Sequence, residues 1–167
     1  LKLDTSAGAP VLNVFGGKIT TYRRLAESAL EKIGGVLGPK SAPWTAGAPL
    51  PGGDFPVGDV ERLIDRLRAN YPFLTEFWTR RLVRAYGTDA SAVLGGAEAA
   101  SDLGKEFGAT LTAREVEWLM HHEFARTAED VVWRRSKLGL RMTSDEIASL
   151  DAWMKTARRD KAFHAAE

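Results

Sequence analysis

Five of the seven prolines in this chain lie within residues 34–57, together with several glycines. Proline has no backbone amide to donate, and its ring clashes inside a helix, so this composition cannot sustain a helix or the interior of a sheet. We therefore interpret residues 34–57 as a linker, and we expect Trp44 to hold it in place by packing against the rest of the protein. The linker is expected to join an N-terminal segment, residues 1–33, to a C-terminal domain, residues 58–167.

After the linker, the apolar residues recur at intervals of three and four, which is the spacing of amphipathic helices. Three pairs have the form of a capping signal, in which a hydroxyl and a carboxylate satisfy free amides where a helix begins. These pairs are Thr112 with Glu115, Thr127 with Asp130, and Thr143 with Glu146. We expect a bundle of five or more helices with little sheet, from about Val57 to about Lys161. Its apolar positions are Leu63, Ile64 and Leu67; Leu74, Phe77, Trp78, Leu82 and Tyr86, ending at Gly87; Val116, Leu119 and Met120; Val131 and Val132, which share one side of a helix with Arg135 that ends at Gly139; and Ile147, Leu150, Trp153 and Met154.

The N-terminal segment has a different pattern. Two short apolar runs, 1–4 and 11–15, flank a turn with glycine and proline and predict a β-hairpin. From Thr20 to Ile33 the apolar spacing becomes helical, and Gly34 with Gly35 is expected to end that helix. The predicted fold is mainly α: a C-terminal helical bundle preceded by a short β-hairpin and one helix.

Composition limits the classes of function. With 167 residues, of which 44% are hydrophobic, the chain can bury a core, and a formal net charge of +1 does not favour nucleic acid as a partner. The absence of cysteine excludes thiolate metal sites and fits a reducing compartment, so we expect the cytoplasm. No apolar run approaches the roughly 20 residues that span a bilayer, and we see no secretory signal. The chain starts at Leu1 without methionine, as expected for part of a longer protein.

The sharpest local motif is Gly16-Gly17-Lys18, between a short strand and a helix. Glycines let a ligand approach the backbone closely, and a helix N-terminus offers unpaired amides at the positive end of its dipole. Lys18 adds a full positive charge, so the motif predicts an anion-binding turn. The alternative is a glycine-rich turn with a solvated lysine, and the motif alone does not decide between them.

The sequence His121-His122-Glu123 is a weak candidate for a metal site. Adjacent residues on a helix point about 100° apart and do not readily bind one ion together. The spacing of a zinc protease motif is missing. We expect ordinary hydrogen bonding by His122 and Glu123, and no metal.

Basic residues gather around Trp133 and in the C-terminal tail. Their side chains can pair across an interface, contact anionic lipid headgroups or touch another domain. The alternative is an amphipathic helix with a solvated basic face. The residues are Arg134, Arg135, Lys137 and Arg141, without an acidic neighbour between Val131 and Arg141, and the tail residues Lys155, Arg158, Arg159 and Lys161.

Several segments together resemble a known family. They are Gly16-Gly17-Lys18-Ile19-Thr20-Thr21-Tyr22-Arg23 followed by Leu25-Ala26-Glu27, then Leu50-Pro51-Gly52-Gly53, Tyr71-Pro72-Phe73-Leu74, Tyr86-Gly87, Ser101-Asp102-Leu103-Gly104, and the segments 122–130 and 133–139. In this order, and over nearly the whole chain, they are similar to the C-terminal region of respiratory, FAD-dependent glycerol-3-phosphate dehydrogenases. The resemblance makes residues 1–33 a strip of the FAD-binding domain and residues 58–167 a helical cap domain.

The resemblance implies FAD contacts from Gly16, Gly17, Lys18, Ile19 and Thr20, and a substrate role for Lys18. It also implies oxidation of glycerol 3-phosphate to dihydroxyacetone phosphate, with electrons passed to quinone at the cytoplasmic face of the inner membrane. The expected partners are the protein's own upstream FAD and substrate domain and a peripheral membrane surface, with a homodimer left open. No catalytic residue is assigned to this segment.

No G-x-G-x-x-G dinucleotide motif occurs in these 167 residues, so the segment alone is expected to lack flavin and activity. The competing hypothesis is a free-standing helical module that binds a partner protein or a membrane surface. A module of that kind has no need for the hairpin and the anion-binding turn, which favours the oxidoreductase.

Overall fold

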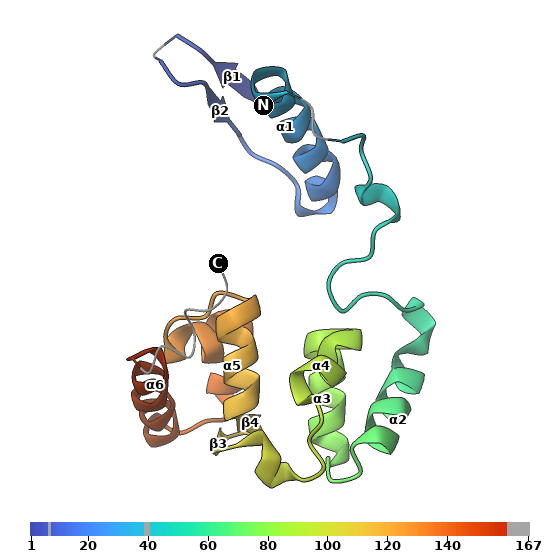
Figure 1. Cartoon of the computed structure of the whole chain (residues 1–167), viewed down its shortest axis with the longest axis vertical. Coiled ribbons are helices and arrows are strands. Elements are labelled where there is room, and N and C mark those ends of the chain that lie inside the picture. Colours follow the sequence, from blue (N-terminus) through green and yellow to red (C-terminus); the bar gives the residue numbers. More distant parts are fainter. Residues whose placement is uncertain (7, 39–40, 160–167) are drawn as a thin grey trace. The chain divides into compact units, whose positions relative to one another are not determined.

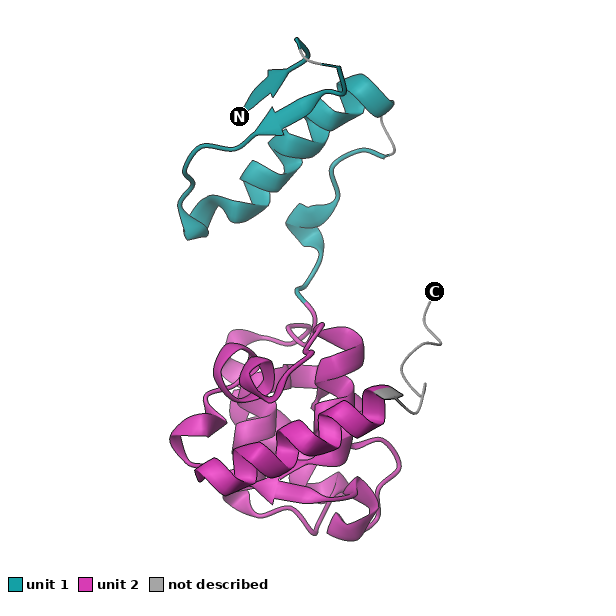
Figure 2. Ribbon diagram, turned by 90° about the vertical axis from the view of Figure 1, so that its left-hand side faces the viewer, with its two compact units in different colours: residues 1–50 teal, residues 51–167 magenta. Residues whose placement is uncertain are grey.

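The computed structural model describes residues 1–6, 8–38 and 41–159. They form two compact units, Leu1–Leu50 and Pro51–Glu167, hereafter the N-terminal unit and the helical unit (Figure 2). The border between the units falls inside the stretch 34–57. The three-part division of the chain stays a prediction.

The N-terminal unit contains the expected hairpin and helix. Strand β1 (Lys2–Asp4) pairs antiparallel with β2 (Val11–Asn13), with Leu3 opposite Leu12 (Figure 1). The predicted turn between them includes Ala7, which lies outside the described residues. Helix α1 (Tyr22–Leu37) follows a 3₁₀ turn, η1 (Ile19–Thr21). The mainly α fold with a leading hairpin is thus confirmed.

The end of α1 was predicted wrongly. Gly34 and Gly35 lie inside the helix, which ends at Leu37, and Gly38 follows with a φ of 82°. A glycine in a helix interior costs only about 1 kcal/mol relative to alanine, so a pair of glycines weakens a helix without having to end it. The left-handed Gly38 is the residue that stops α1.

The N-terminal unit buries little. None of its described side chains is buried, and Trp44, expected to pin the linker, is 67% exposed. Along α1 the predicted apolar face is at best half-buried, as at Leu25. This unit has secondary structure without a core of its own.

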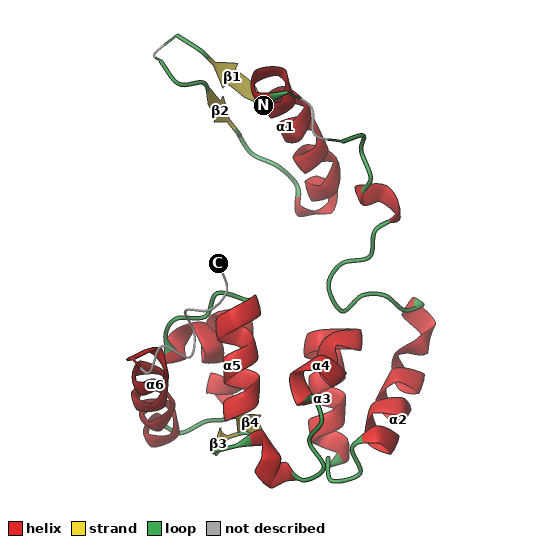
Figure 3. Ribbon diagram, viewed as in Figure 1, coloured by secondary structure: helices red, strands yellow, loops and turns green. Residues whose placement is uncertain are grey.

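The helical unit has five α-helices and one small hairpin among its described residues (Figure 3). Helices α2 and α3 pack together, and α4 packs against both α3 and α5. The elements are α2 (Val60–Asn70), α3 (Glu76–Tyr86), α4 (Ala90–Leu94), α5 (Ala113–His122), α6 (Ser144–Arg159), β3 (Glu106–Gly108) and β4 (Leu111–Thr112). The predicted end of the bundle near Lys161 lies outside the described residues.

The predicted apolar stripes make the core of the helical unit. Phe77 is an exception: it is 45% exposed, and the Arg141 guanidinium lies over its ring. Fully buried members from four segments are Leu82, Val116, Leu119, Val131, Val132, Leu150 and Met154. Among the described residues, no helix has the length and apolar character needed to cross a membrane.

Two of the three capping signals form. The Thr143 amide donates to Glu146 Oε2 at 2.7 Å, and the Glu146 amide donates back to Thr143 Oγ1 at 3.3 Å. Thr127 and Asp130 exchange bonds in the same way. The helix they open is a π-helical segment, η6 (Asp130–Arg135), which ends before Gly139 rather than at it.

The third signal was wrong in its chemistry. Helix α5 does begin after Thr112, but the Thr112 hydroxyl caps no amide. Glu115 points instead into the core, where it is 2% exposed. Arg81 on α3 forms an ion pair with Glu115 there.

Candidate functional site

The predicted anion-binding turn lies between β2 and α1. Gly16 and Gly17 have φ values of 69° and 143°, a region that side chains other than glycine rarely adopt. A Cβ built on Gly16 would meet nothing within 4 Å, so the turn has an open face there. A Cβ on Gly17 would lie 3.1 Å from Leu25, so Gly17 also lets the turn pack against α1.

Lys18 follows the two glycines in extended conformation and is the N-cap residue of η1. The Thr21 amide and hydroxyl both donate to the Lys18 carbonyl, each at 3.0 Å. The sequence predicted a helix directly after the glycines, whereas one 3₁₀ turn comes first and α1 begins at Tyr22. The tighter turn places Lys18 one turn before α1.

The electrostatics of this turn suit an anion. The first amides of a helix have no partner inside it, and neither η1 nor α1 has an acidic side chain in its first turn. Lys18 and Thr20 are exposed, and Ile19 is 85% exposed. Backbone amides, a lysine and open glycines can together hold a phosphate or another anion.

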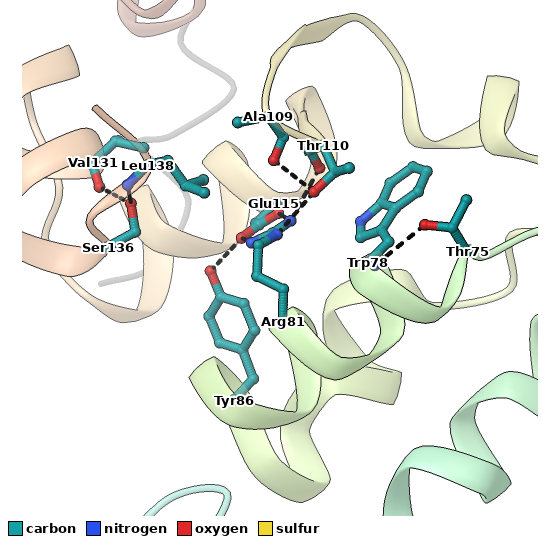
Figure 4. Close-up of polar contacts among 10 residues, drawn as sticks. All are labelled: Thr75, Trp78, Arg81, Tyr86, Ala109, Thr110, Glu115, Val131, Ser136 and Leu138. Atoms are coloured by element: carbon teal, nitrogen blue, oxygen red, sulfur yellow. Dashed lines mark hydrogen bonds and ion pairs between the residues drawn. The ribbon is translucent and has the colours of Figure 1, made fainter. Parts of the chain in front are cut away.

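A second polar cluster lies inside the helical unit, and the sequence analysis missed it. Arg81 on α3 donates to both carboxylate oxygens of Glu115 on α5, each at 2.7 Å (Figure 4). Arg81 also donates to the hydroxyl and the carbonyl of Thr110, at 2.9 and 3.0 Å. The Tyr86 hydroxyl donates to Glu115 Oε1 at 2.8 Å.

Burial and charge act on this cluster together. Burial opposes the charge of Arg81, but the hydrogen bonds and charge of Glu115 outweigh it, so the pKa of Arg81 is raised. Burial and the neighbouring Glu115 charge raise the pKa of Tyr86 well above its usual range, so its hydroxyl remains a donor. Each buried polar side chain in the described residues has a partner. We therefore assign the cluster a structural role.

One feature of the sequence does indicate this cluster: charged residues on the apolar faces of two helices. Glu115 lies four residues before Leu119, on the apolar face of α5, and Arg81 lies three residues after Trp78, on the apolar face of α3. A carboxylate on a buried face needs a cation, because an unpaired buried charge is costly. The signal indicates that a partner exists without saying which residue it is.

The histidines at the end of α5 make local contacts. The His122 ring stacks on Trp118 with 3.8 Å between ring centroids, and its Nδ1 lies 3.3 Å from the Trp118 carbonyl. The Glu123 carbonyl accepts from Arg135 Nε at 2.6 Å. Within residues 1–6, 8–38 and 41–159, no three histidine, cysteine or acidic residues gather in a way that could hold a metal ion.

The basic residues near Trp133 are partly engaged. Arg134 pairs with Asp130 at 3.0 Å and with Glu129 at 3.4 Å, so this arginine is neutralised by acids just before the basic run. Lys137 donates to the Trp133 carbonyl, and Arg141 lies 4.9 Å from the centre of the Phe77 ring. In the tail, Lys155 pairs with Asp151. Lys161 lies outside the described residues, and so does the side chain of Arg159.

Known proteins match most of the chain. The sequence profile of the C-terminal domain of alpha-glycerophosphate oxidase matches residues 43–165. The aerobic glycerol-3-phosphate dehydrogenase of Escherichia coli (strain K12) is 42% identical over 151 residues, which are 90% of this chain and 30% of that protein. A glycerol-3-phosphate dehydrogenase of Pseudomonas aeruginosa is 43% identical, covering 92% of this chain and 30% of that protein.

A third relative differs in its substrate. The D-erythritol 1-phosphate dehydrogenase of Brucella abortus (strain 2308) is 39% identical over 155 residues, 93% of this chain and 31% of that protein. The chain thus spans about three tenths of the length of the relatives it matches.

Proposed function

Since the chain belongs to the family of the C-terminal domain of alpha-glycerophosphate oxidase, we propose that it is the C-terminal part of an FAD-dependent glycerol-3-phosphate dehydrogenase. The observation that carries this proposal is the match to two glycerol-3-phosphate dehydrogenases, over 90% and 92% of the chain. The reaction is the oxidation of glycerol 3-phosphate to dihydroxyacetone phosphate.

The substrate class is a phosphorylated polyol. Two relatives are named for glycerol 3-phosphate and one for D-erythritol 1-phosphate, and both compounds carry a phosphate dianion beside hydroxylated carbons. Lys18 follows two open glycines at the start of a helical segment, where charge and helix dipole act on an anion together. We propose glycerol 3-phosphate as the substrate and Lys18 as a contact to its phosphate or to the flavin.

The same turn fits a flavin cofactor. The backbone at Gly16 is open, and Ile19 and Thr20 are exposed, so Gly16, Gly17, Lys18, Ile19 and Thr20 can present backbone and charge to a flat, partly anionic group. When bound, FAD would accept the two electrons of the oxidation. The positive end of the helical segment and Lys18 favour negative charge nearby, which suits a reduced flavin.

The proposed partner of the N-terminal unit is the upstream FAD and substrate domain of the same protein. Large apolar side chains of this unit are exposed to solvent: Phe15 is 75% exposed and Leu37 is 72% exposed. A unit without a buried side chain among its described residues gains stability by covering such a surface. The hairpin and α1 supply a strand edge and a helix for that purpose.

The electron acceptor is proposed to be quinone, at the cytoplasmic face of the inner membrane. Arg135 and Arg141 on the helical unit can add to a peripheral contact with anionic lipid, at about 1 kcal/mol for each basic residue near the surface. Arg134 contributes less, because its charge is already paired with Asp130 and Glu129. A homodimer is compatible with this arrangement and stays a prediction.

The test compares the full-length protein with the 167-residue segment. The full-length protein should purify with flavin and reduce a quinone analogue when glycerol 3-phosphate is added, with a lower rate on erythritol 1-phosphate. The segment should carry no flavin and show no turnover. A full-length protein without flavin, or one that is inactive on both phosphates, would contradict the proposal and favour a helical interaction module.

A further inference from the structure

Residues 45–52 cross the border between the two units, and their first residue is held by a polar cluster on α1. The Thr45 hydroxyl donates to Glu27 Oε1 at 2.5 Å, and Arg23 donates to the same oxygen at 2.8 Å. Arg23 also donates to Thr45 Oγ1 at 3.3 Å. We call Arg23, Glu27 and Thr45 the Thr45 clamp; it ties the stretch to α1 at the 3₁₀ turn η2 (Thr45–Gly47).

The clamp is a specific arrangement. The Thr45 hydrogen bond, followed by the charge of Arg23, lowers the pKa of Glu27, so the carboxylate holds its charge in this contact. The side chains of Arg23 and Glu27 are 34% and 24% exposed. One carboxylate oxygen of Glu27 therefore accepts from two donors, Arg23 and Thr45, that are 22 residues apart in the chain.

The other end of the stretch is fixed to the helical unit by backbone contacts. The Thr88 amide donates to the Gly52 carbonyl at 2.9 Å. A Cβ on Gly52 would lie 2.1 Å from the Tyr86 carbonyl oxygen, and one on Gly87 would lie 1.8 Å from the Gly52 oxygen. Both glycines have left-handed φ values, 72° and 55°. We call Gly52, Gly87 and Thr88 the Gly52 anchor.

Little freedom remains between the clamp and the anchor. After η2 only Ala48, Pro49, Leu50 and Pro51 precede Gly52. Each proline fixes its own φ and forces the preceding residue into extended conformation, as seen at Ala48 with φ −88° and ψ 128°. All four residues are therefore restricted, and the chain from Thr45 to Gly52 can span at most about 25 Å.

We propose that residues 45–52 are a clamped spacer, fixed at one end by the Thr45 clamp and at the other by the Gly52 anchor, with the backbone between η2 and Gly52 restricted by its two prolines. Glu27 and Thr45 are then positioning residues: they determine where the connection leaves α1, the helix that follows the anion-binding turn. A free linker would instead lack both attachments and would sample many conformations.

Chymotrypsin tests the clamp in the 167-residue chain. Between residues 41 and 57, Leu50 and Phe55 are each followed by proline, so the bond after the exposed Trp44 is the one that the protease can readily cut. Glu27→Ala should speed cleavage after Trp44 by about fivefold or more, because local opening controls proteolysis. Alanine is a strong helix former, so α1 should persist, as circular dichroism can verify.

The matched control is Glu31→Ala, which removes an exposed carboxylate one turn further along α1. Its cleavage rate after Trp44 should equal that of the parent chain. Equal rates for the parent and Glu27→Ala would overturn the clamp. So would a parent rate as fast as that of an unstructured peptide of residues 41–57.

Distance measurements test the spacer. Because the chain has no cysteine, Ala46→Cys with Asp54→Cys gives a unique pair of spin labels across the prolines. The parent pair should give a narrow distance distribution, and Pro49→Gly with Pro51→Gly should widen it about twofold, since glycine restores backbone freedom. Pro10→Gly, outside the spacer, should leave the width unchanged. An unchanged width in the double glycine variant would overturn the spacer.

Discussion

The Arg81 guanidinium binds both oxygens of the Glu115 carboxylate, and this pair joins α3 to α5 through the core of the helical unit (Figure 4). The Glu115 side chain is 2% exposed and that of Arg81 is 13% exposed. Such a pair is largely shielded from water, so removing one partner leaves the other charge buried without compensation.

We expect Arg81→Met to destabilise the helical unit by about 3 to 5 kcal/mol, because it leaves the Glu115 charge buried without a cation. Methionine has a length close to that of the arginine stem, so packing should change little. Urea unfolding followed by tryptophan fluorescence measures the loss. Arg80→Met, which removes the exposed pair with Glu61, is the control and should cost much less.

The double variant Arg81→Met with Glu115→Leu should recover most of the stability lost by Arg81→Met. An apolar pair in place of a buried ion pair is often neutral or stabilising. If the double variant is less stable than Arg81→Met alone, the hydrogen bond that Glu115 accepts from Tyr86 matters more than the removal of its charge.

Glu115 and Glu146 show how far the sequence determines the fold. Both stand three residues after a threonine at the start of a helix, yet Glu146 caps its helix and Glu115 does not. A local motif predicts local partners, and Arg81 lies 34 residues away from Glu115. Helix positions and buried faces therefore followed from periodicity, whereas the choice of Glu115 between two partners depended on tertiary packing.

The candidate site was also predicted only in part. Gly16, Gly17 and Lys18 were predicted as a turn before a helix, and the left-handed glycines are where the motif placed them. The 3₁₀ turn before Tyr22 was not predicted, since apolar spacing does not show the bonds that the Thr21 amide and hydroxyl donate to the Lys18 carbonyl. The Thr45 clamp was not predicted either, because contacts between distant polar residues have no periodic pattern.

A second prediction concerns Gly87. Gly87→Ala should destabilise the helical unit by at least about 1 to 3 kcal/mol, because alanine is strained at a φ of 55° and its Cβ would collide with the Gly52 carbonyl. Gly96→Ala is the matched control, since its Cβ would meet nothing within 4 Å, and it should stay within about 0.5 kcal/mol. Equal unfolding midpoints in urea for the two variants would contradict the close approach of Gly52 and Gly87.

A third prediction concerns acid. The Arg126 and Thr127 amides donate to Asp130, and with Arg134 they hold the pKa of Asp130 below its ordinary value of 3.8. Folding thus favours the ionised form. The ionised Asp130 contributes its full stability to the folded state above its ordinary pKa of 3.8. This stability is lost as the pH falls through the lowered pKa of the folded state.

Asp130→Asn should therefore reduce the loss of unfolding free energy between about pH 5 and about pH 2.5, because this residue no longer binds a proton on unfolding. Urea titrations at several pH values in this range measure the difference. If the parent and Asp130→Asn lose stability in parallel, the cap at the start of η6 has no part in acid unfolding.

The last prediction concerns Lys18 in the full-length enzyme. Lys18→Ala should impair turnover much more than folding, because Lys18 follows two open glycines at the positive end of a helical segment. An exposed lysine without a ligand would change stability by no more than about 0.5 kcal/mol and leave the kinetics unchanged. A charge-assisted contact to substrate or flavin corresponds to roughly a ten- to hundredfold loss in kcat/KM when it is removed.

Steady-state kinetics separate the two roles of Lys18. A lysine that binds the substrate phosphate in both the ground state and the transition state should raise KM when removed and leave kcat unchanged. A lysine that acts only on charge developing at the flavin should lower kcat and kcat/KM together. Lys2→Ala on β1, an exposed lysine in the same unit, is the control and should match the parent. If the flavin-loaded Lys18→Ala enzyme stays within about twofold of the parent in both parameters, a change far below that expected for a charged contact, then Lys18 lies outside the site and the Gly16-Gly17 backbone alone meets the ligand.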